Sequence, residues 1–419
     1  MAEKILVCTV GGSADPIVTA IRETRPSCVI FVCSSGERSS RSMVEGENGI
    51  AARSGLKPGA WKVFEVPPDE PTEIFVSCRH LLGELRRTNP QPEVIVDYTG
   101  GTKSMSLGLA LAALTRETAL QVTTGARADL VKVTGGTEHA VQVPVGLVYA
   151  EFAVDEAASA WSRYAYEDAA RLLQPAYHAF LHAAAEDTRL RGRRDRVKRT
   201  LWAARMFAAW DRFAHGEARS LWLEERLDQL PGMPPYGKAL EMLSAENREP
   251  LILLDLWHNA LRRASRGRFD DALARLYRLV EWSAQYLLRT ERGIETAAFD
   301  PAMLPEGELR SRLASRMNRR GRVPIGLFDA FAVLRQLLPD HPLAAALAVP
   351  FAGETPLHRL QQWIERRNHS ILAHGFVPVD RDLWNQAEGW MQSHWLSWLQ
   401  EELQKKGQDL PQFPTAFPA

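Results

Sequence analysis

The sequence has few cysteines, no excess of either charge and no long apolar run. Its 419 residues include four cysteines, Cys8, Cys28, Cys33 and Cys78, which lie inside apolar stretches without a CxxC spacing. We expect reduced cytosolic thiols packed as small hydrophobic groups, neither a zinc site nor a disulfide framework. No stretch approaches about 18 uninterrupted apolar residues and no signal peptide is evident, so we expect a cytoplasmic protein without a membrane span.

The charge balance and the missing motifs exclude several function classes. The 51 Lys and Arg residues are balanced by 51 Asp and Glu residues, so the chain as a whole is not expected to bind nucleic acid nonspecifically. A local basic pocket is not excluded by this balance. The dinucleotide fingerprint GxGxxG and the P-loop spacing GxxxxGK[ST] are absent, as are HExxH, an HD pair and a two-metal carboxylate cluster. We therefore expect neither a metal nor a cofactor, and a small-molecule Rossmann enzyme is the least favoured alternative.

The first part of the chain, residues 1–150, alternates strand and helix patterns. Cys-Val-Ile-Phe-Val-Cys at 28–33 is typical of a strand buried on both faces. The same reasoning predicts further strands at 4–10, 61–66, 94–97 and 119–124, and helices at 15–25, 72–87 and 104–116. Residues 130–133 and 145–149 are expected to extend the sheet or form a hairpin. This alternation predicts a Rossmann-like, doubly wound parallel sheet.

From about residue 155 the strand patterns end and helical periodicity dominates. Helices are predicted at 157–185, 196–213, 251–290, 327–338, 357–374 and 381–404. The breaker cluster at 231–235 ends one helical unit. We predict a helical connecting region at 151–250, a helical domain at 251–406 and a flexible tail at 407–419, which holds three prolines.

Two loops of the predicted sheet carry ligand-binding chemistry. In a doubly wound sheet, ligands bind beyond the carboxyl ends of the strands, where strand order reverses. The first predicted strand ends in Gly11, Gly12 and Ser13, and a later one runs into Thr99, Gly100, Gly101, Thr102, Lys103 and Ser104 at a helix start. Glycines admit a ligand close to the backbone, while a helix N-terminus, hydroxyls and one lysine suit an anionic phosphodiester. For Gly11 and Gly12, a tight strand-to-helix turn explains the pattern equally well; Ser34 is a further candidate.

In the helical half, Arg367 and His374 are seven residues apart within Arg-Arg-Asn-His-Ser-Ile-Leu-Ala-His-Gly. Seven steps of about 100° place both side chains on one helix face, and Gly375 is a helix stop. Arginine can hold a scissile phosphate, while histidine can exchange a proton with a ribose hydroxyl or the departing oxygen. Without further context, such a pair is more often a solvated arginine and a packed histidine than a catalytic pair.

Two stretches resemble known families. Asp-Tyr-Thr-Gly-Gly-Thr-Lys-Ser-Met-Ser at 97–106 resembles the ligand loop of CARF domains, the sensors of CRISPR-associated proteins. The segment at 366–375 resembles the Rx4–6H motif of HEPN ribonucleases, here with Asn368 directly after the arginine. Residues 259–281 are similar to the preceding helices of CRISPR-associated HEPN domains. For most of these residues, an amphipathic helix with an apolar stripe and solvent-exposed arginines is a sufficient explanation.

Together these features resemble the CARF–HEPN ribonucleases of type III CRISPR systems. The resemblance implies a homodimer that binds cyclic oligoadenylate across two sensor domains. It also implies metal-independent cleavage of single-stranded RNA by Arg367, Asn368 and His374, and possible degradation of the activator at Thr102 and Lys103. The main alternative is a ligand-responsive DNA-binding regulator, for which the basic stretch 189–199 is the candidate contact. The helical spacing of the tryptophans at 363–398 indicates that they pack in the protein core and do not stack on bases.

Overall fold

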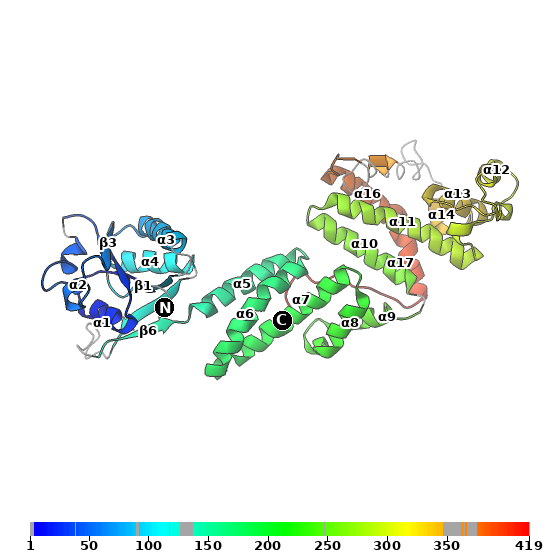
Figure 1. Cartoon of the computed structure of the whole chain (residues 1–419). Coiled ribbons are helices and arrows are strands. Elements are labelled where there is room, and N and C mark those ends of the chain that lie inside the picture. The colour runs from blue at the N-terminus through cyan, green and yellow to red at the C-terminus, as the bar shows by residue number, and fades with distance from the viewer. Residues whose placement is uncertain are drawn as a thin grey trace. The chain divides into compact units, whose positions relative to one another are not determined.

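The computed structural model describes residues 4–37, 39–88, 92–116, 118–125, 137–246, 248–346, 362–363, 365–366 and 375–418. The chain divides into two compact units, Met1–Tyr149 and Ala150–Ala419 (Figure 1). Among the residues just given, no helix is long and apolar enough to cross a membrane.

The first unit is built on one six-stranded sheet in the order β3-β2-β1-β4-β5-β6. Its strands are β1 (Lys4–Thr9), β2 (Cys28–Ser34), β3 (Trp61–Val66), β4 (Glu93–Asp97), β5 (Ala119–Thr124) and β6 (His139–Val143). β1 to β5 pair in parallel, and β6 runs antiparallel to β5. The predicted parallel sheet is thus confirmed.

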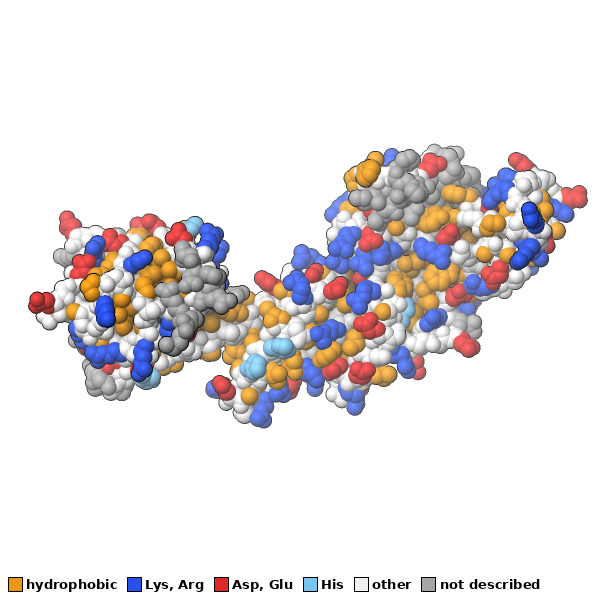
Figure 2. All heavy atoms as spheres, viewed as in Figure 1, with side chains coloured by type: hydrophobic (Ala, Val, Ile, Leu, Met, Phe, Trp, Pro, Cys, Tyr) orange, Lys and Arg blue, Asp and Glu red, His pale blue; other side chains and the backbone are white. Residues whose placement is uncertain are grey.

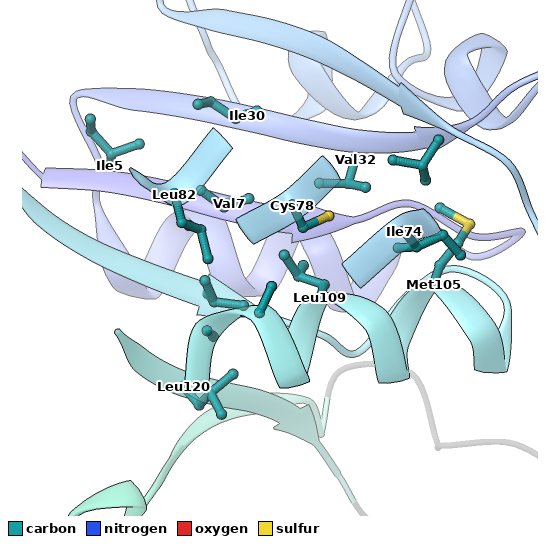
Figure 3. Close-up of a cluster of buried hydrophobic side chains, with 14 residues drawn as sticks. Ile5, Val7, Ile30, Val32, Ile74, Cys78, Leu82, Met105, Leu109 and Leu120 are labelled. Atoms are coloured by element: carbon teal, nitrogen blue, oxygen red, sulfur yellow. The ribbon is translucent and has the colours of Figure 1, made fainter. Parts of the chain in front are cut away.

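Helices cover both faces of this sheet because its central strands are apolar on both sides. Alternate residues of β1 point to opposite faces, so that Val7 packs in one core cluster and Leu6 in the other. On Val7's side lie side chains of α3 (Pro71–Thr88) and α4 (Lys103–Leu114), such as Cys78 and Leu109 (Figure 3). The other face packs on α1 (Asp15–Thr24), the 3₁₀ turn η1 (Ser40–Met43) and α2 (Ile50–Arg53).

The structure joins none of the four cysteines in a disulfide. Three of them, Cys8, Cys33 and Cys78, are buried within the two core clusters. Burial raises the pKa of Cys33 to about 11 and that of Cys78 to about 12. These thiols therefore stay protonated near neutral pH and serve as packing groups.

Two sequence predictions at the end of this unit differ from the structure. Residues 145–149 do not extend the sheet but begin α5 (Val145–Ser162), whose buried side chains recur at helical spacing, as at Ala150, Val154 and Ala157. The strand β6 was not predicted, because it lies at the sheet edge and its residues are exposed or half-buried. The other expected extension, 130–133, lies outside the described residues.

In its described parts the second unit consists of helices and the loops that join them, apart from one isolated bridge between Phe299 and Val323. The long predicted helix at 157–185 is two helices, because the chain turns at Tyr164 with a φ of 58°. After α5, the first helices are α6 (Tyr166–Glu186), η2 (Thr188–Leu190), α7 (Arg191–Asp211), α8 (His215–Glu224), η3 (Leu227–Gln229) and α9 (Pro234–Met242). They are followed by α10 (Glu249–Ser265), α11 (Phe269–Arg292), η4 (Thr296–Ala298), η5 (Pro301–Met303), α12 (Glu308–Ala314), α13 (Leu327–Leu337), α14 (Pro342–Ala346), α16 (Arg381–His394) and α17 (Leu396–Lys405).

The segment after Lys406 is not the flexible tail that the sequence predicts. Leu410 and Phe413 are each only 3% exposed. The Tyr166 hydroxyl donates a hydrogen bond to the Pro414 carbonyl at 2.8 Å, and the Trp161 and Phe417 ring centroids lie 5.3 Å apart. Prolines prevent a helix here, but they leave an extended segment free to pack on helices α6, α7 and α10.

Candidate functional site

The two predicted ligand loops meet at the point where strand order reverses. β1 pairs with β2 on one side and with β4 on the other, so the loops after β1 and β4 leave the same edge of the sheet side by side. This is the crevice in which doubly wound sheets bind ligands.

Glycines allow these loops to touch. A Cβ on Gly100 would lie 2.3 Å from the Thr9 carbonyl oxygen, and one on Gly11 would lie 2.6 Å from the Gly101 nitrogen. Gly101 also has a φ of +81°, which L side chains rarely adopt. Gly11 and Gly100 are therefore needed for the contact between the loops themselves. Gly12 is different, because a Cβ at this residue would meet nothing within 4 Å.

A pocket of about 340 Å³ opens beside this contact. Of the predicted ligand residues it is lined by Gly11, Gly12, Ser34, Gly101 and Thr102. Ser13, Thr99, Gly100, Lys103 and Ser104 belong to the same loops but do not line it. The structure thus gathers half of the predicted set around one cavity.

Two of the predicted hydroxyls are committed to the loop. Thr102 caps α4 by accepting a hydrogen bond from the Met105 N–H at 3.1 Å, and its hydroxyl donates to the Pro68 carbonyl. The Thr99 hydroxyl accepts a hydrogen bond from the Thr123 N–H on β5 at 2.7 Å. Lys103, by contrast, is exposed and forms no ion pair with a described residue. It is the cation that this loop offers to a ligand.

The buried carboxylate of Asp97 holds the loop after β4. Asp97 is 1% exposed and accepts hydrogen bonds from the Thr99 N–H at 2.9 Å, from Gln121 at 3.1 Å and from Thr123 at 3.2 Å. All three donors are neutral, so Asp97 positions the loop through hydrogen bonds and not through an ion pair.

Sequence reasoning missed one wall of the pocket. Ser39, Ser40, Ser42 and Met43, in and just before η1, line it from the side of β2. Ser34 and Ser40 each donate a backbone N–H to the other's hydroxyl at 2.9 Å, which ties this turn to the end of β2. The signal was the cluster of serines at 34–42, of which only Ser34 was predicted to bind the ligand.

The predicted catalytic residues, Arg367, Asn368 and His374, lie outside the described residues. The chain is described again from Gly375 and is not helical until α16 begins. In this stretch the Val379 N–H donates a hydrogen bond to Asp270 on α11 at 3.2 Å, and Asp380 caps α16 by accepting from the Leu383 N–H at 2.8 Å.

The arginines that open the HEPN-like stretch at 259–281 do not form the wet face that the helix pattern predicts. Arg262 is 1% exposed, with its Nε 2.8 Å from Asp211 and its guanidinium 3.7 Å from the ring centroid of Phe413. Arg263 pairs with Asp211 at 2.8 Å, and burial lowers its pKa. The apolar stripe at Ala272, Leu276, Leu279 and Val280 is buried as predicted.

A buried polar network therefore joins α7, α8 and α10, which sequence reasoning did not foresee. Asp255 accepts a hydrogen bond from the Trp210 indole at 2.9 Å and lies 2.9 Å from the His215 ring nitrogen. Asn259 donates to the Asp211 carboxylate at 2.8 Å. Every member sits in the helix core, where the network fixes how the helices pack.

The tryptophans at 363–398 and the ring of His258 serve to pack the helical unit. Trp363, Trp384, Trp390, Trp395 and Trp398 are all at most 7% exposed, so they pack and present no face to a base. Burial lowers the pKa of His258 to about 4, so its ring is neutral at physiological pH.

The basic stretch at 189–199 is neutralised by its neighbours only in part. It spans η2 and the start of α7, where Arg189 pairs with Asp187, Arg193 with Glu151, and Lys198 with Glu225. Val197, in the middle of the stretch, is 2% exposed. Arg191, Arg196 and Arg199 are exposed and form no ion pair with a described residue, so these pairs do not decide against the regulator alternative.

Comparison with known proteins agrees with the fold. Residues 243–394 match the family model described as the Csm6 HEPN domain. This stretch is similar to the HEPN domain of Csm6. It includes the Arg367–His374 motif. The solved structure of Enterococcus italicus Csm6 bound to cyclic hexa-2′-fluoro-hexa-dAMP matches with a TM-score of 0.59 and 14% identity, covering 96% of this chain and 95% of that chain. No curated protein matches the sequence.

The solved structure agrees with the predicted architecture, a Rossmann-like α/β unit followed by a helical region, and the family model matches residues 243–394 of that region. Within the described ranges, no group of three or more His, Cys, Asp or Glu side chains is arranged to hold a metal ion.

Proposed function

We propose that this protein is a cyclic oligoadenylate-activated endoribonuclease that cuts single-stranded RNA in type III CRISPR defence. The observation that carries the proposal is the HEPN match at 243–394, because it spans the sequence Arg367-Asn368 and His374. The α/β unit supports it with a pocket at the strand-order reversal, where an anionic ligand can bind.

In the proposed reaction, the ribose 2′-hydroxyl adjacent to the scissile linkage attacks the phosphorus. His374 exchanges protons with the 2′-hydroxyl or the departing 5′-oxygen, Arg367 stabilises the charge on the phosphoryl oxygens, and Asn368 helps to position the phosphate. The bond to the 5′-oxygen breaks as the new bond forms. The products carry a 2′,3′-cyclic phosphate and a 5′-hydroxyl, and no metal ion is required.

Two chains would contribute to each site. In the proposed homodimer, the Arg367 and His374 of both subunits form one composite cleft, and one cyclic oligoadenylate spans two sensor pockets. Gly12, Ser34 and Thr102 line each pocket and Lys103 lies beside it, so the backbone and one cation can meet the ring's phosphates. The E. italicus Csm6 structure holds such a cyclic ligand.

Activation requires that the ligand bind the cleaving arrangement more tightly than the resting one. The connecting helices at 151–250 are the proposed transmitter between the sensor and the HEPN domain. The sensor is also proposed to degrade its activator slowly. Lys103 is the residue to test for that activity, because the Thr102 hydroxyl is already engaged in capping α4.

The test is a cleavage assay with fluorescent single-stranded RNA, a panel of cyclic oligoadenylates and a chelator. We expect cleavage with one ring size and at least a hundredfold loss in Arg367→Ala and His374→Ala, because general acid–base catalysis alone contributes that much. His369→Ala is the matched control and should retain activity, because His369 is only two residues from Arg367 and would face another side of the predicted helix. Cleavage that needs added magnesium, or that survives His374→Ala at the wild-type rate, would refute the mechanism.

A further inference from the structure

A pocket lined by arginines lies in the second unit. It has a volume of about 390 Å³, and its wall is formed by the α5–α6 turn, the end of α7 and the α10–α11 turn. Five arginines line it, namely Arg171, Arg212, Arg263, Arg266 and Arg268. Figure 2 shows Lys and Arg side chains gathered over this part of the unit.

Three of these arginines already have carboxylate partners. Arg171 lies 3.4 Å from Asp168, Arg212 lies 3.6 Å from Glu217, and Arg263 lies 2.8 Å from Asp211. Arg266 and Arg268 form no ion pair with any residue that the structure describes. Glu167, Asp168 and Asp211 also line the pocket, but Arg266 and Arg268, at its α10–α11 turn, have no ion-pair partner among the described residues.

The turn holds both groups in place. Gly267, between them, has a φ of +72°, and the Arg268 N–H donates a hydrogen bond to the Arg263 carbonyl at 3.0 Å. The buried Nε of Arg263 has no hydrogen-bond partner in the described part of the chain, its closest carboxylate oxygen there being 3.7 Å away on Asp271. Across the pocket lies the half-buried ring of Tyr164.

The pocket is connected to the chain that follows the catalytic motif. Phe269 and Asp270 come directly after Arg268; the Val379 N–H bonds to Asp270 at 3.2 Å, and the Arg381 guanidinium lies 5.5 Å from the Phe269 ring centroid. Gly375, the residue after His374 in the sequence, is four residues from Val379. A chain of four residues spans at most about 14 Å. A few nucleotides of extended RNA can cover such a separation.

We propose that this pocket binds backbone phosphates of the single-stranded RNA substrate on one side of the cleaved linkage, with Arg266 and Arg268 as the contacts. The inference rests on the proposed function. Free guanidinium groups recognise phosphate oxygens in a bidentate manner, and an aromatic ring beside them provides a stacking surface for an unpaired base. The pocket would hold substrate and so lower KM, while the chemistry stays with the HEPN motif.

The test measures the affinity of a fluorescent 20-nucleotide RNA whose 2′-hydroxyls are all methylated, so that cleavage cannot occur. Fluorescence anisotropy is followed across a salt series for the wild type and for Arg266→Ala/Arg268→Ala. We expect the double variant to bind at least about tenfold more weakly and its salt slope to fall by about 1.4, since each single-strand phosphate contact contributes about 0.7. In cleavage assays KM should rise and kcat should hold.

The control variant is Arg319→Ala/Arg335→Ala, which removes the same charge from exposed positions of the same unit. It should bind and cleave as the wild type does. Unchanged affinity in the Arg266/Arg268 variant, or an equal loss in the control, would overturn the inference. A wild-type protein that cleaves no RNA with any activator would instead overturn the proposed function. The binding titration would still test whether Arg266 and Arg268 bind RNA.

Discussion

Removing Arg262 tests whether the buried network holds the helical unit together. The Arg262 side chain is 1% exposed, donates to Asp211 at 2.8 Å and to the Gln412 side chain at 2.7 Å, and lies 3.5 Å from Asp255. In Arg262→Met, the volume is roughly kept and the charge is lost. Asp255 then keeps only the Trp210 indole and the His215 ring as partners.

The expected loss follows from this geometry. Removing one partner of a buried ion pair destabilises a protein by about 3–5 kcal/mol, because the other charge stays buried without compensation. The lost cation–π contact with Phe413, at 3.7 Å, acts in the same direction. We expect a loss of about 4 kcal/mol. Arg278→Ala is the control, because its pair with Glu281 is half-exposed and contributes at most about 1 kcal/mol.

The assay is denaturant unfolding followed by tryptophan fluorescence. Trp61 is the only tryptophan of the first unit, and the other eleven of the 12 lie in the second, so the signal reports the helical unit. Adding Asp255→Asn to Arg262→Met should restore part of the loss, because a neutral side chain needs no counter-ion. A loss below 1 kcal/mol in Arg262→Met, or strict additivity of the two substitutions, would refute the reasoning.

Three further predictions concern the ligand loops, one histidine and the C-terminal segment. Gly11→Ala should lower both the melting temperature and the affinity for cyclic oligoadenylate in calorimetry, whereas Gly12→Ala should lower affinity alone, since only the former Cβ meets backbone. Because the folded-state pKa of His258 is lowered to about 4, the unfolded chain binds its proton first as pH falls below 6.5. Stability should therefore fall by about 3 kcal/mol between pH 6.5 and 4, and less in His258→Gln; parallel pH profiles would contradict this. Ending the chain after Lys406 should cost about 3–6 kcal/mol through the loss of buried Leu410 and Phe413, and an unchanged melting temperature would show that the segment does not pack.

The sheet could be predicted from sequence where its strands are buried on both faces. The sequence of residues 28–33 predicts a strand because every side chain in this run is apolar, and the structure buries nearly all of them. His139–Val143 could not be predicted, because an edge strand with exposed side chains has no such pattern. Local composition therefore determines the central strands but not the edge.

The candidate sensor site was predictable only in part, because some of its residues are placed by tertiary contacts. Gly11, Gly12 and Gly101 stand out because strand ends followed by glycine are visible in sequence, and they do line the pocket. Ser39 and Ser42 reach it from a turn whose position depends on the Ser34–Ser40 hydrogen bonds. Those contacts are tertiary, so the sequence shows the serines without showing where they lie.

The buried arginine limits how the proposed activating signal would pass through the helical unit. Arg262 of α10 joins Asp211 of α7 to Gln412 of the C-terminal segment, so separating these elements would cost about 3–5 kcal/mol. Moving a two-state equilibrium from 1:99 to 99:1 takes about 5.5 kcal/mol of differential binding. If the ligand had to break this network, most of its differential binding free energy would be needed for that step. We therefore expect α7, α10 and the C-terminal segment to move as one body during activation, with the change confined to contacts outside the network.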